Sequence, residues 1–193
     1  MSTKVQARQR RGRLPISGRA LFFSGLALAV ILLGGFTWLL FQPSKDTTPA
    51  GGVGIGQAAP GFTLPDANGH QVTLGSFRGH PVIINFWASY CQPCQDELPL
   101  LEGFYQQHQA QGLVILGINE GEPVSIMSDY AQRYKLSYPV LADRTLQFNS
   151  DASYNPALLP RTYFIDKQGI VRAVSNGELS PQILQADYQK ISG

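Results

Sequence analysis

An almost continuously apolar stretch runs directly into the segment that carries both cysteines of the chain. The stretch is Pro81–Trp87, and its pattern is typical of a strand that is buried on both faces. A helix is predicted to follow from about Gln92 to Gln109, so Cys91 and Cys94 stand at the junction between strand and helix. A strand buried on both faces needs covering layers on both sides of its sheet, which favours an α/β fold.

The remaining segments alternate between strand-like and helix-like patterns. In chain order they are an edge strand at His70–Leu74, a buried strand at Leu113–Ile118, a helix at Val124–Tyr134, a hairpin of Thr162–Asp166 with Ile170–Ser175, and a closing helix at Ser180–Lys190. An Asn68-Gly69 turn precedes the first of them, and Ser180 is expected to cap the last helix. This order predicts an α/β domain over residues 57–193, with a central mixed sheet flanked by helices.

The start of the chain has the pattern of a membrane anchor. Residues 20–41 carry no charge, and a helix of about 20 apolar residues is long enough to span a bilayer. Residues 1–19 carry six basic side chains and no acidic one, so the positive-inside rule predicts a cytoplasmic tail there. Residues 42–56, rich in Pro, Gly and Thr, are expected to form a flexible linker. We therefore expect a single-pass protein of the cytoplasmic membrane, with its domain on the periplasmic or extracellular face.

A cleaved signal peptide is the alternative interpretation of the same run. Signal peptides usually have an apolar region of about 7–15 residues that ends at a site of the small-x-small type. The run here is longer, and its best candidate site, Thr48-Pro49-Ala50, contains a proline. An uncleaved anchor is favoured, and both interpretations place the domain outside the cytoplasm.

The charge of the chain is divided unevenly. Residues 42–193 hold nine basic and thirteen acidic side chains, a net charge of −4, while the basic cluster lies beside the apolar run. Because an acidic domain repels phosphate, the sequence indicates that nucleic acid is not a partner.

The spacing of the two cysteines suggests thiol chemistry. A cysteine at a helix N-terminus is favoured as a thiolate, which is the nucleophile in thiol–disulfide exchange, and a second cysteine one turn later can resolve a mixed disulfide. An inert structural disulfide is one alternative. Half of a zinc site is another, but the histidines His70, His80 and His108 are singly placed. We expect no metal site and no cofactor.

Three stretches give the domain a resemblance to a known family. They are Phe86-Trp87-Ala88-Ser89-Tyr90-Cys91-Gln92-Pro93-Cys94 with the following Glu97-Leu98-Pro99, the stretch Leu159-Pro160-Arg161-Thr162-Tyr163-Phe164-Ile165-Asp166, and the redoxin-like start Ala59-Pro60-Gly61-Phe62-Thr63-Leu64. From about Gly56 to its end, the chain resembles the thioredoxin superfamily, and more narrowly the membrane-anchored TlpA/ResA-type thiol-disulfide oxidoreductases. The resemblance implies a thioredoxin-like fold.

The resemblance also implies roles for individual residues. Cys91 would be the attacking thiol and Cys94 the resolving thiol of a redox-active disulfide. Pro160 would be a cis-proline that faces the active site. Glu97 would be partly buried, with a raised pKa, and would exchange protons with the thiols. From the residues alone, Glu97 is equally well explained as a solvated glutamate on a helix.

Further residues around these are expected to contact clients, namely Trp87, Tyr90, Pro93, Leu159 and Arg161. Two of them depart from the family's pattern, since Tyr90 replaces the commoner Trp and Arg161 replaces the commoner Thr after the cis-proline. Arg161 would bring a positive charge near the cysteine pair. The acidic stretch Asn119–Glu122 follows a strand and is expected to line the substrate approach or to be solvated.

The expected function is reduction of disulfides in client proteins, apocytochrome c among them, with electrons from a membrane thiol-disulfide transporter. A peroxiredoxin-like antioxidant is an alternative. Peroxiredoxins place Pro seven and Thr three residues before the reactive cysteine, however, and Ile84 and Ala88 occupy those positions here. A membrane-anchored adaptor with a structural disulfide is the alternative that involves no catalysis.

Overall fold

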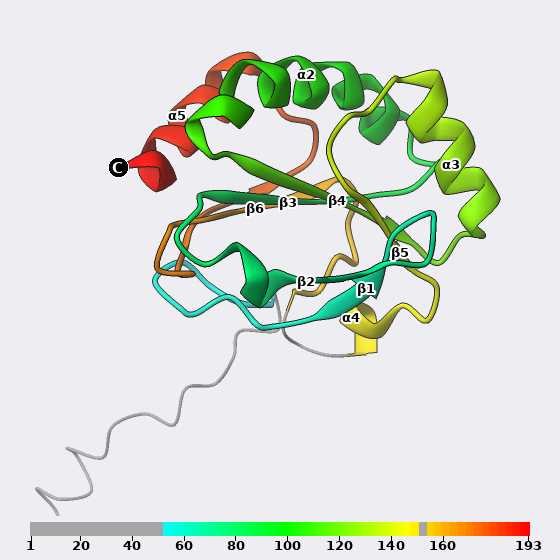
Figure 1. The fold of residues 1–193 in the computed structure, drawn as a ribbon, viewed down its shortest axis with the longest axis horizontal. Helices are drawn as coiled ribbons and strands as arrows, with labels where there is room; N and C mark the ends of the chain where they lie inside the picture. Colours follow the sequence, from blue (N-terminus) through cyan, green and yellow to red (C-terminus); the bar gives the residue numbers. More distant parts are fainter. Residues whose placement is uncertain (1–51, 151–153) are drawn as a thin grey trace, which may run out of the picture. The chain divides into compact units, whose positions relative to one another are not determined.

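The central feature of the structure, a computed structural model that describes residues 52–150 and 154–193, is a mixed sheet with the strand order β5-β4-β3-β6-β7 (Figure 1). In chain order its strands are β3 (Val82–Trp87), β4 (Val114–Glu120), β5 (Val140–Asp143), β6 (Arg161–Ile165) and β7 (Val171–Asn176). The strand β4 lies parallel to β3 and β5, whereas β6 is antiparallel to β3 and β7. All of β3 is buried, so the predicted central strand and the mixed sheet are both confirmed.

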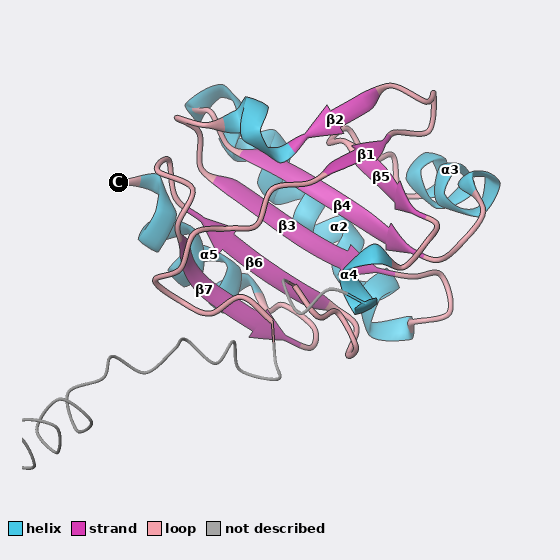
Figure 2. Ribbon diagram, turned by 90° about the horizontal axis from the view of Figure 1, so that it is seen from below, coloured by secondary structure: helices cyan, strands magenta, loops and turns pink. Residues whose placement is uncertain are grey.

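Helices cover one face of the sheet, and a small hairpin with short helices covers the other. The first layer holds α2 (Gln92–His108), the short η2 (Gln109–Gln111), α3 (Val124–Arg133) and α5 (Pro181–Ser192). The second layer holds β1 (Thr63–Pro65), β2 (Gln71–Thr73), η1 (Leu74–Phe77) and α4 (Gln147–Ser150). Figure 2 shows the second layer in front of the sheet and α2 and α5 behind it. Each face therefore has its own apolar cluster, and this pair of clusters stabilises the fold.

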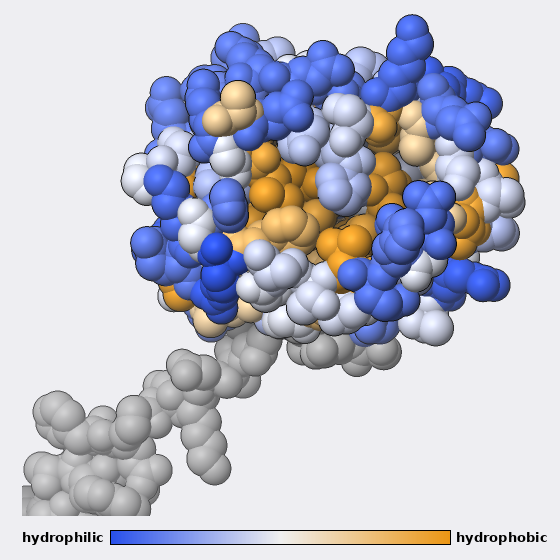
Figure 3. All heavy atoms as spheres, viewed as in Figure 1, coloured by the Kyte–Doolittle hydropathy of each residue, from blue (hydrophilic) through white to orange (hydrophobic). Residues whose placement is uncertain are grey.

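The distribution of hydrophilic and apolar side chains on the surface follows the same layers. In the view of Figure 1, hydrophilic side chains cover the helical layer, and apolar side chains are visible between that layer and the β1–β2 layer (Figure 3).

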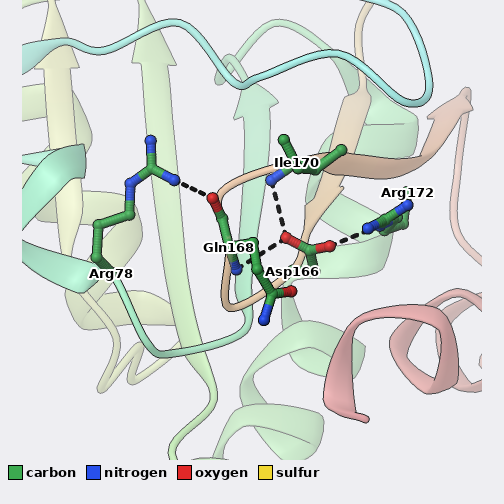
Figure 4. A network of polar contacts seen from close by, with 5 residues as sticks. All are labelled: Arg78, Asp166, Gln168, Ile170 and Arg172. Atoms are coloured by element: carbon green, nitrogen blue, oxygen red, sulfur yellow. Dashed lines mark hydrogen bonds and ion pairs between the residues drawn. The ribbon is translucent and has the colours of Figure 1, made fainter.

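The predicted hairpin of β6 and β7 is confirmed, and the side chain of Asp166 shapes its turn (Figure 4). Its carboxylate accepts hydrogen bonds from the backbone N–H groups of Gln168 (3.0 Å) and Ile170 (2.8 Å) and from Nε of Arg172 (2.6 Å). Burial opposes ionisation, but these donors lower the pKa of Asp166. The Arg78 guanidinium donates to the carbonyl oxygen of Gln168. Because Ile165 pairs with Val82 at the start of β3, this turn lies at the end of the sheet away from the cysteines.

Several short elements are absent from the sequence prediction, among them β5 and α4. The strand β5 has four residues, and α4 also has four. Elements this short show no clear periodicity, and β5 is fixed by its pairing with Gly117–Glu120 of β4 and by a bridge between Leu141 and Asp66.

The predicted boundary between linker and domain needs a correction. Val53 falls within the predicted flexible linker 42–56 but is buried in the cluster under β1 and β2, and Gly56 donates a backbone hydrogen bond to the carbonyl oxygen of Val171 (2.8 Å). The folded part therefore begins before residue 57. Val53 and the exposed Ile55 both stand among glycines, so the local sequence gives no sign that only Val53 will be covered.

The predicted cytoplasmic tail (1–19) and transmembrane helix (20–41) lie outside the described residues. Among the helices of residues 52–150 and 154–193, none is both long and apolar enough to cross a bilayer.

Candidate active site

The site begins where β3 passes into α2, and Cys91 is the N-cap residue of that helix. Its backbone is extended (φ −95°, ψ 103°), and its Sγ accepts a hydrogen bond from the backbone N–H of Cys94 at 3.2 Å. Pro93 lies in the first turn, where its missing N–H costs the helix nothing. The predicted position of Cys91 at a helix N-terminus is confirmed, and both the N–H donor and the helix dipole favour a thiolate at this sulfur.

Cys91 and Cys94 form a disulfide, with their Cα atoms 5.3 Å apart. Cys94 has no exposed surface, whereas Cys91 is half-buried and lines a pocket. An incoming client sulfur can therefore reach Cys91 but not Cys94. This difference in access fits the predicted division between an attacking and a resolving thiol.

The loop before Cys91 is held by an acidic side chain from the loop that follows β4. The Glu122 carboxylate accepts the backbone N–H of Ser89 (2.7 Å), the Ser89 hydroxyl, and Nδ2 of Asn119 (2.7 Å). Nε2 of Gln95 donates to the Ser89 carbonyl at 2.7 Å. Within the stretch Asn119–Glu122, Glu122 is thus a positioning residue, which fixes the backbone that leads to the nucleophile.

Glu97 is buried on the sheet-facing side of α2, one turn after Cys94. Only 1% of it is exposed, so the interpretation as a solvated glutamate is wrong. Its Oε1 accepts Nδ2 of Asn85 (2.7 Å), and its Oε2 accepts the backbone N–H of Leu179 (2.9 Å). Residues three apart share a helix face, so Glu97 and Cys94 lie on the same side of α2.

Burial raises the pKa of Glu97 to about 7, and the charge of Glu178 raises it too, against the hydrogen bonds from Leu179 and Asn85, which lower it. The predicted burial and raised pKa are therefore confirmed. A carboxyl group with such a pKa is present in both protonation states near neutrality, so it can accept and return a proton. Proton exchange with the thiols remains a prediction for Glu97.

The peptide bond Leu159–Pro160 is cis, as predicted. Leu159 and Cys91 line the same pocket. The volume of this pocket is about 450 Å³. The pocket walls come from the start of α2 (Tyr90–Pro93), from Glu120 at the end of β4, and from Leu146 and the loop before Pro160. Tyr90 is 74% exposed at its edge. The structure thus brings Tyr90, Pro93 and Leu159 together around Cys91, where client contact is predicted.

Trp87 requires a correction. Its side chain has no exposed surface and packs against Tyr130, with ring centroids 5.8 Å apart. It therefore supports the site from inside the core and cannot touch a client. As the last residue of a strand buried on both faces, its side chain points into the layer under α2 and α3.

The side chain of Arg161 is bonded to the loop that precedes Pro160. Its guanidinium donates to the Asn155 carbonyl (2.7 Å) and lies 5.4 Å from the centroid of the Tyr163 ring. Tyr163 belongs to the apolar cluster on the face of the sheet opposite α2. An effect of Arg161 on Cys91 or on a client stays a prediction.

Asn85 and Glu120 are the residues that sequence reasoning valued too little. Asn85 interrupts an otherwise apolar buried strand, and a buried amide needs partners, so its position carried a signal. Nδ2 of Asn85 donates to Glu97 and to Oγ1 of Thr162 (3.0 Å). Glu120 is only 3% exposed and lines the Cys91 pocket.

Among the described residues no group of three or more His, Cys, Asp or Glu side chains is arranged to hold a metal ion.

Comparisons with known proteins agree with this geometry. Residues 55–174 match the AhpC/TSA family. The chain is 32% identical to the thiol-disulfide oxidoreductase ResA of Geobacillus kaustophilus, over 86% of this chain and 92% of that protein. It is 31% identical to ResA of Bacillus subtilis, over 90% of this chain and 93% of the relative.

Solved structures show the same fold. A thiol:disulfide interchange protein of the thioredoxin family from Chlorobium tepidum superposes with a TM-score of 0.64 at 24% identity, covering 73% of this chain and 99% of that one. A secreted disulfide oxidoreductase from Mycobacterium tuberculosis gives 0.59 at 20% identity, covering 66% and 94%. The chain therefore belongs to the AhpC/TSA family and is a thioredoxin-like thiol-disulfide oxidoreductase of the TlpA/ResA type.

Proposed function

We propose that this oxidoreductase is anchored in the cytoplasmic membrane by residues 20–41 and reduces disulfides of client proteins outside the cytoplasm. The observation that carries the activity is the accessible Cys91 at the N-terminus of α2, with buried Cys94 bonded to it. In this mechanism the Cys91 thiolate attacks a client disulfide, and Cys94 then attacks the mixed disulfide and releases the reduced client.

The reducing direction is supported by the electrostatics around the pair. An ionised carboxylate near two thiols disfavours their thiolate forms, and a less stable reduced state makes a dithiol a stronger reductant. Glu97 is such a group, because its pKa of about 7 leaves it largely ionised in mildly alkaline conditions. Apocytochrome c is the client that we propose, and a membrane thiol-disulfide transporter is the proposed electron donor.

Client identity is tested by trapping. The variant Cys94→Ala keeps the attacking thiol and lacks the resolving one, so it should accumulate mixed disulfides with its clients in cells. Mass spectrometry of the trapped complexes should identify exported proteins with paired cysteines. The matched control is Cys91→Ala, which should trap none of them. Complexes only with cytoplasmic proteins would contradict the proposed location and client class.

Topology has its own test. A reporter that is active only outside the cytoplasm, fused after Gly193, should be active, because the basic residues 1–19 favour the cytoplasmic side. The same reporter fused after Arg19 should be inactive. Activity of a strictly cytoplasmic reporter at Gly193 would overturn the predicted orientation.

A peroxiredoxin-like activity is not favoured by the site. The positions where peroxiredoxins carry Pro and Thr are occupied by Ile84 and Ala88, and both side chains are fully buried in the apolar core. Hydrogen peroxide consumption by the reduced protein should therefore remain close to that of a free dithiol.

A further inference from the structure

A second buried carboxyl group, that of Glu120, lies on the client side of the cysteine pair. In the parallel pairing of β4 and β5, Glu120 is opposite Asp143, so the two side chains leave the same face of the sheet at its carboxyl edge. Alternation along β4 places this face with Leu116 and Ile118, in the cluster opposite α2. Glu97 approaches from the α2 side, so the two carboxyl groups flank the sheet from opposite faces.

Asp143 is the acidic neighbour of Glu120, and its charge helps to keep the Glu120 carboxyl group protonated. The Asp143 carboxylate is buried and accepts the backbone N–H groups of Gln147 (3.1 Å) and Phe148 (3.5 Å) and the Thr145 hydroxyl (3.4 Å). Asp143 thus lies opposite Glu120 with its carboxylate oxygens hydrogen-bonded. Burial, followed by the charge of Asp143, raises the pKa of Glu120 to about 8. Near neutral pH the Glu120 carboxyl group is therefore largely protonated.

Burial and the charge of Asp143 are the causes that shift the pKa of Glu120. The sequence of α4, Gln147–Ser150, contains no titratable residue, and the pocket wall formed by Leu146, Pro156, Ala157 and Leu159 contains none either. Tyr90 and Cys91, just before α2, also line the pocket. The nearby Glu122 carboxylate accepts hydrogen bonds from Ser89 and Asn119. Among the described residues, Asp143 is thus opposite Glu120 in the strand pairing, and the ionisable side chains of Tyr90 and Cys91 share its pocket.

Glu120 and Cys91 line one pocket, together with Leu159 from the cis-proline loop. A client disulfide that reaches Cys91 must enter this pocket, because Cys94 is fully buried. When Cys91 bonds to one client sulfur, the other client sulfur leaves on the pocket side. We infer that Glu120 is a catalytic proton donor to the client sulfur that departs when Cys91 attacks, and the acceptor of that proton in the reverse direction.

The Cys91 thiolate forms a bond to one client sulfur, the client S–S bond breaks, and its electron pair leaves with the second client sulfur as a thiolate. Glu120 gives its proton to that thiolate and becomes a carboxylate, which water later reprotonates. The inference requires only thiol–disulfide exchange, and it holds for either net direction of electron flow.

The test compares two disulfides that differ in how much the leaving sulfur needs a proton. The aryl thiolate of 5,5′-dithiobis(2-nitrobenzoate) is weakly basic and departs unprotonated, whereas the alkyl thiolate of oxidised glutathione is basic. With the full chain reduced and kept in detergent, Glu120→Gln should slow the reaction with oxidised glutathione about 10-fold at pH 7. This is below the usual 10²–10⁴-fold range because water can also supply a proton. The rate with the aryl disulfide should change less than about two-fold.

The matched control is Asp129→Asn, which removes an exposed carboxylate from α3 and should alter neither rate. A second measurement needs no variant. In the wild-type protein the rate with oxidised glutathione, divided by the rate with the aryl disulfide, should fall as the pH rises through about 8, because Glu120 then loses its proton. This ratio cancels the ionisation of Cys91, which both reactions share.

Equal slowing of both substrates by Glu120→Gln would assign Glu120 a structural role and overturn the inference. An unchanged rate with oxidised glutathione, or a pH-independent ratio in the wild type, would overturn it too. A chain that behaves as expected in these assays but traps no exported client would contradict the proposed function alone.

Discussion

Replacing Cys91 with serine should abolish disulfide reduction, whereas Cys94→Ser should keep the first step and stop at a mixed disulfide. The reason lies in access and electrostatics. Cys91 is half-buried in the pocket and accepts the N–H of Cys94, and Cys94 has no exposed surface. Without Cys91 no accessible nucleophile remains among the cysteines of the chain, which has two. This is the largest effect that we expect from any single substitution.

The measurement is turnover of a peptide disulfide by the reduced protein, with mass spectrometry of the product bound to Cys94→Ser. In the reduced wild-type protein, iodoacetamide should also alkylate Cys91 faster than Cys94. The variant Asp96→Asn, at an exposed residue of the same helix that does not line the pocket, serves as a control for general perturbation of the start of α2. Equal alkylation of the two cysteines, or turnover that survives Cys91→Ser, would contradict this assignment.

The second large effect is expected from Glu97→Gln, which preserves shape and removes a titrating group. Reduction of a disulfide substrate should slow by up to about 10²-fold, because positioned proton transfer typically contributes 10²–10⁴-fold and water can partly replace it. The ionised Glu97 disfavours a nearby thiolate. In the variant, the pH curve for alkylation of Cys91 should therefore shift to lower pH.

The pH dependence of stability gives an independent readout of the Glu97 carboxyl group. Burial raises its pKa in the folded state from 4.5 to about 7. Between these values the unfolded chain is ionised at this position while the folded chain keeps the proton, so the contribution to stability is full below about 4.5. It declines as the pH rises to about 7, by about 3 kcal/mol at most. Urea unfolding at a series of pH values should show that decline in the wild type and a flatter profile in Glu97→Gln.

An alkylation curve and an activity that match the wild type would remove Glu97 from the site, even if the variant were less stable. The control is Glu102→Gln, since Glu102 is also a buried glutamate of α2. Its carboxylate accepts the backbone N–H of Ser137 (2.7 Å), a residue far along the chain from Cys91 and Cys94. It should affect stability without shifting the alkylation of Cys91.

The sequence alone determined the features that depend on neighbouring residues. The apolar stretch that became β3, the helix that starts beside Cys91, the Ser180 cap and the turn after Asp166 follow from local periodicity and from residues that favour caps and turns. The cis bond before Pro160 was implied by the family resemblance and is present. The chemistry of the cysteine pair could likewise be predicted, because its position at a helix N-terminus is itself a local property.

Only the tertiary structure decided which polar groups surround the pair. Glu97 receives hydrogen bonds from Asn85 and from Leu179, which lie 12 and 82 residues away in the chain. Glu120 meets Asp143 because β5, too short to be recognised from its sequence, pairs with β4 in one particular register. Trp87 is predicted from the sequence to contact clients, but it is fully buried in the core. Such contacts depend on strand order and register, which are set by the packing of the whole sheet and not by the residues next to each position.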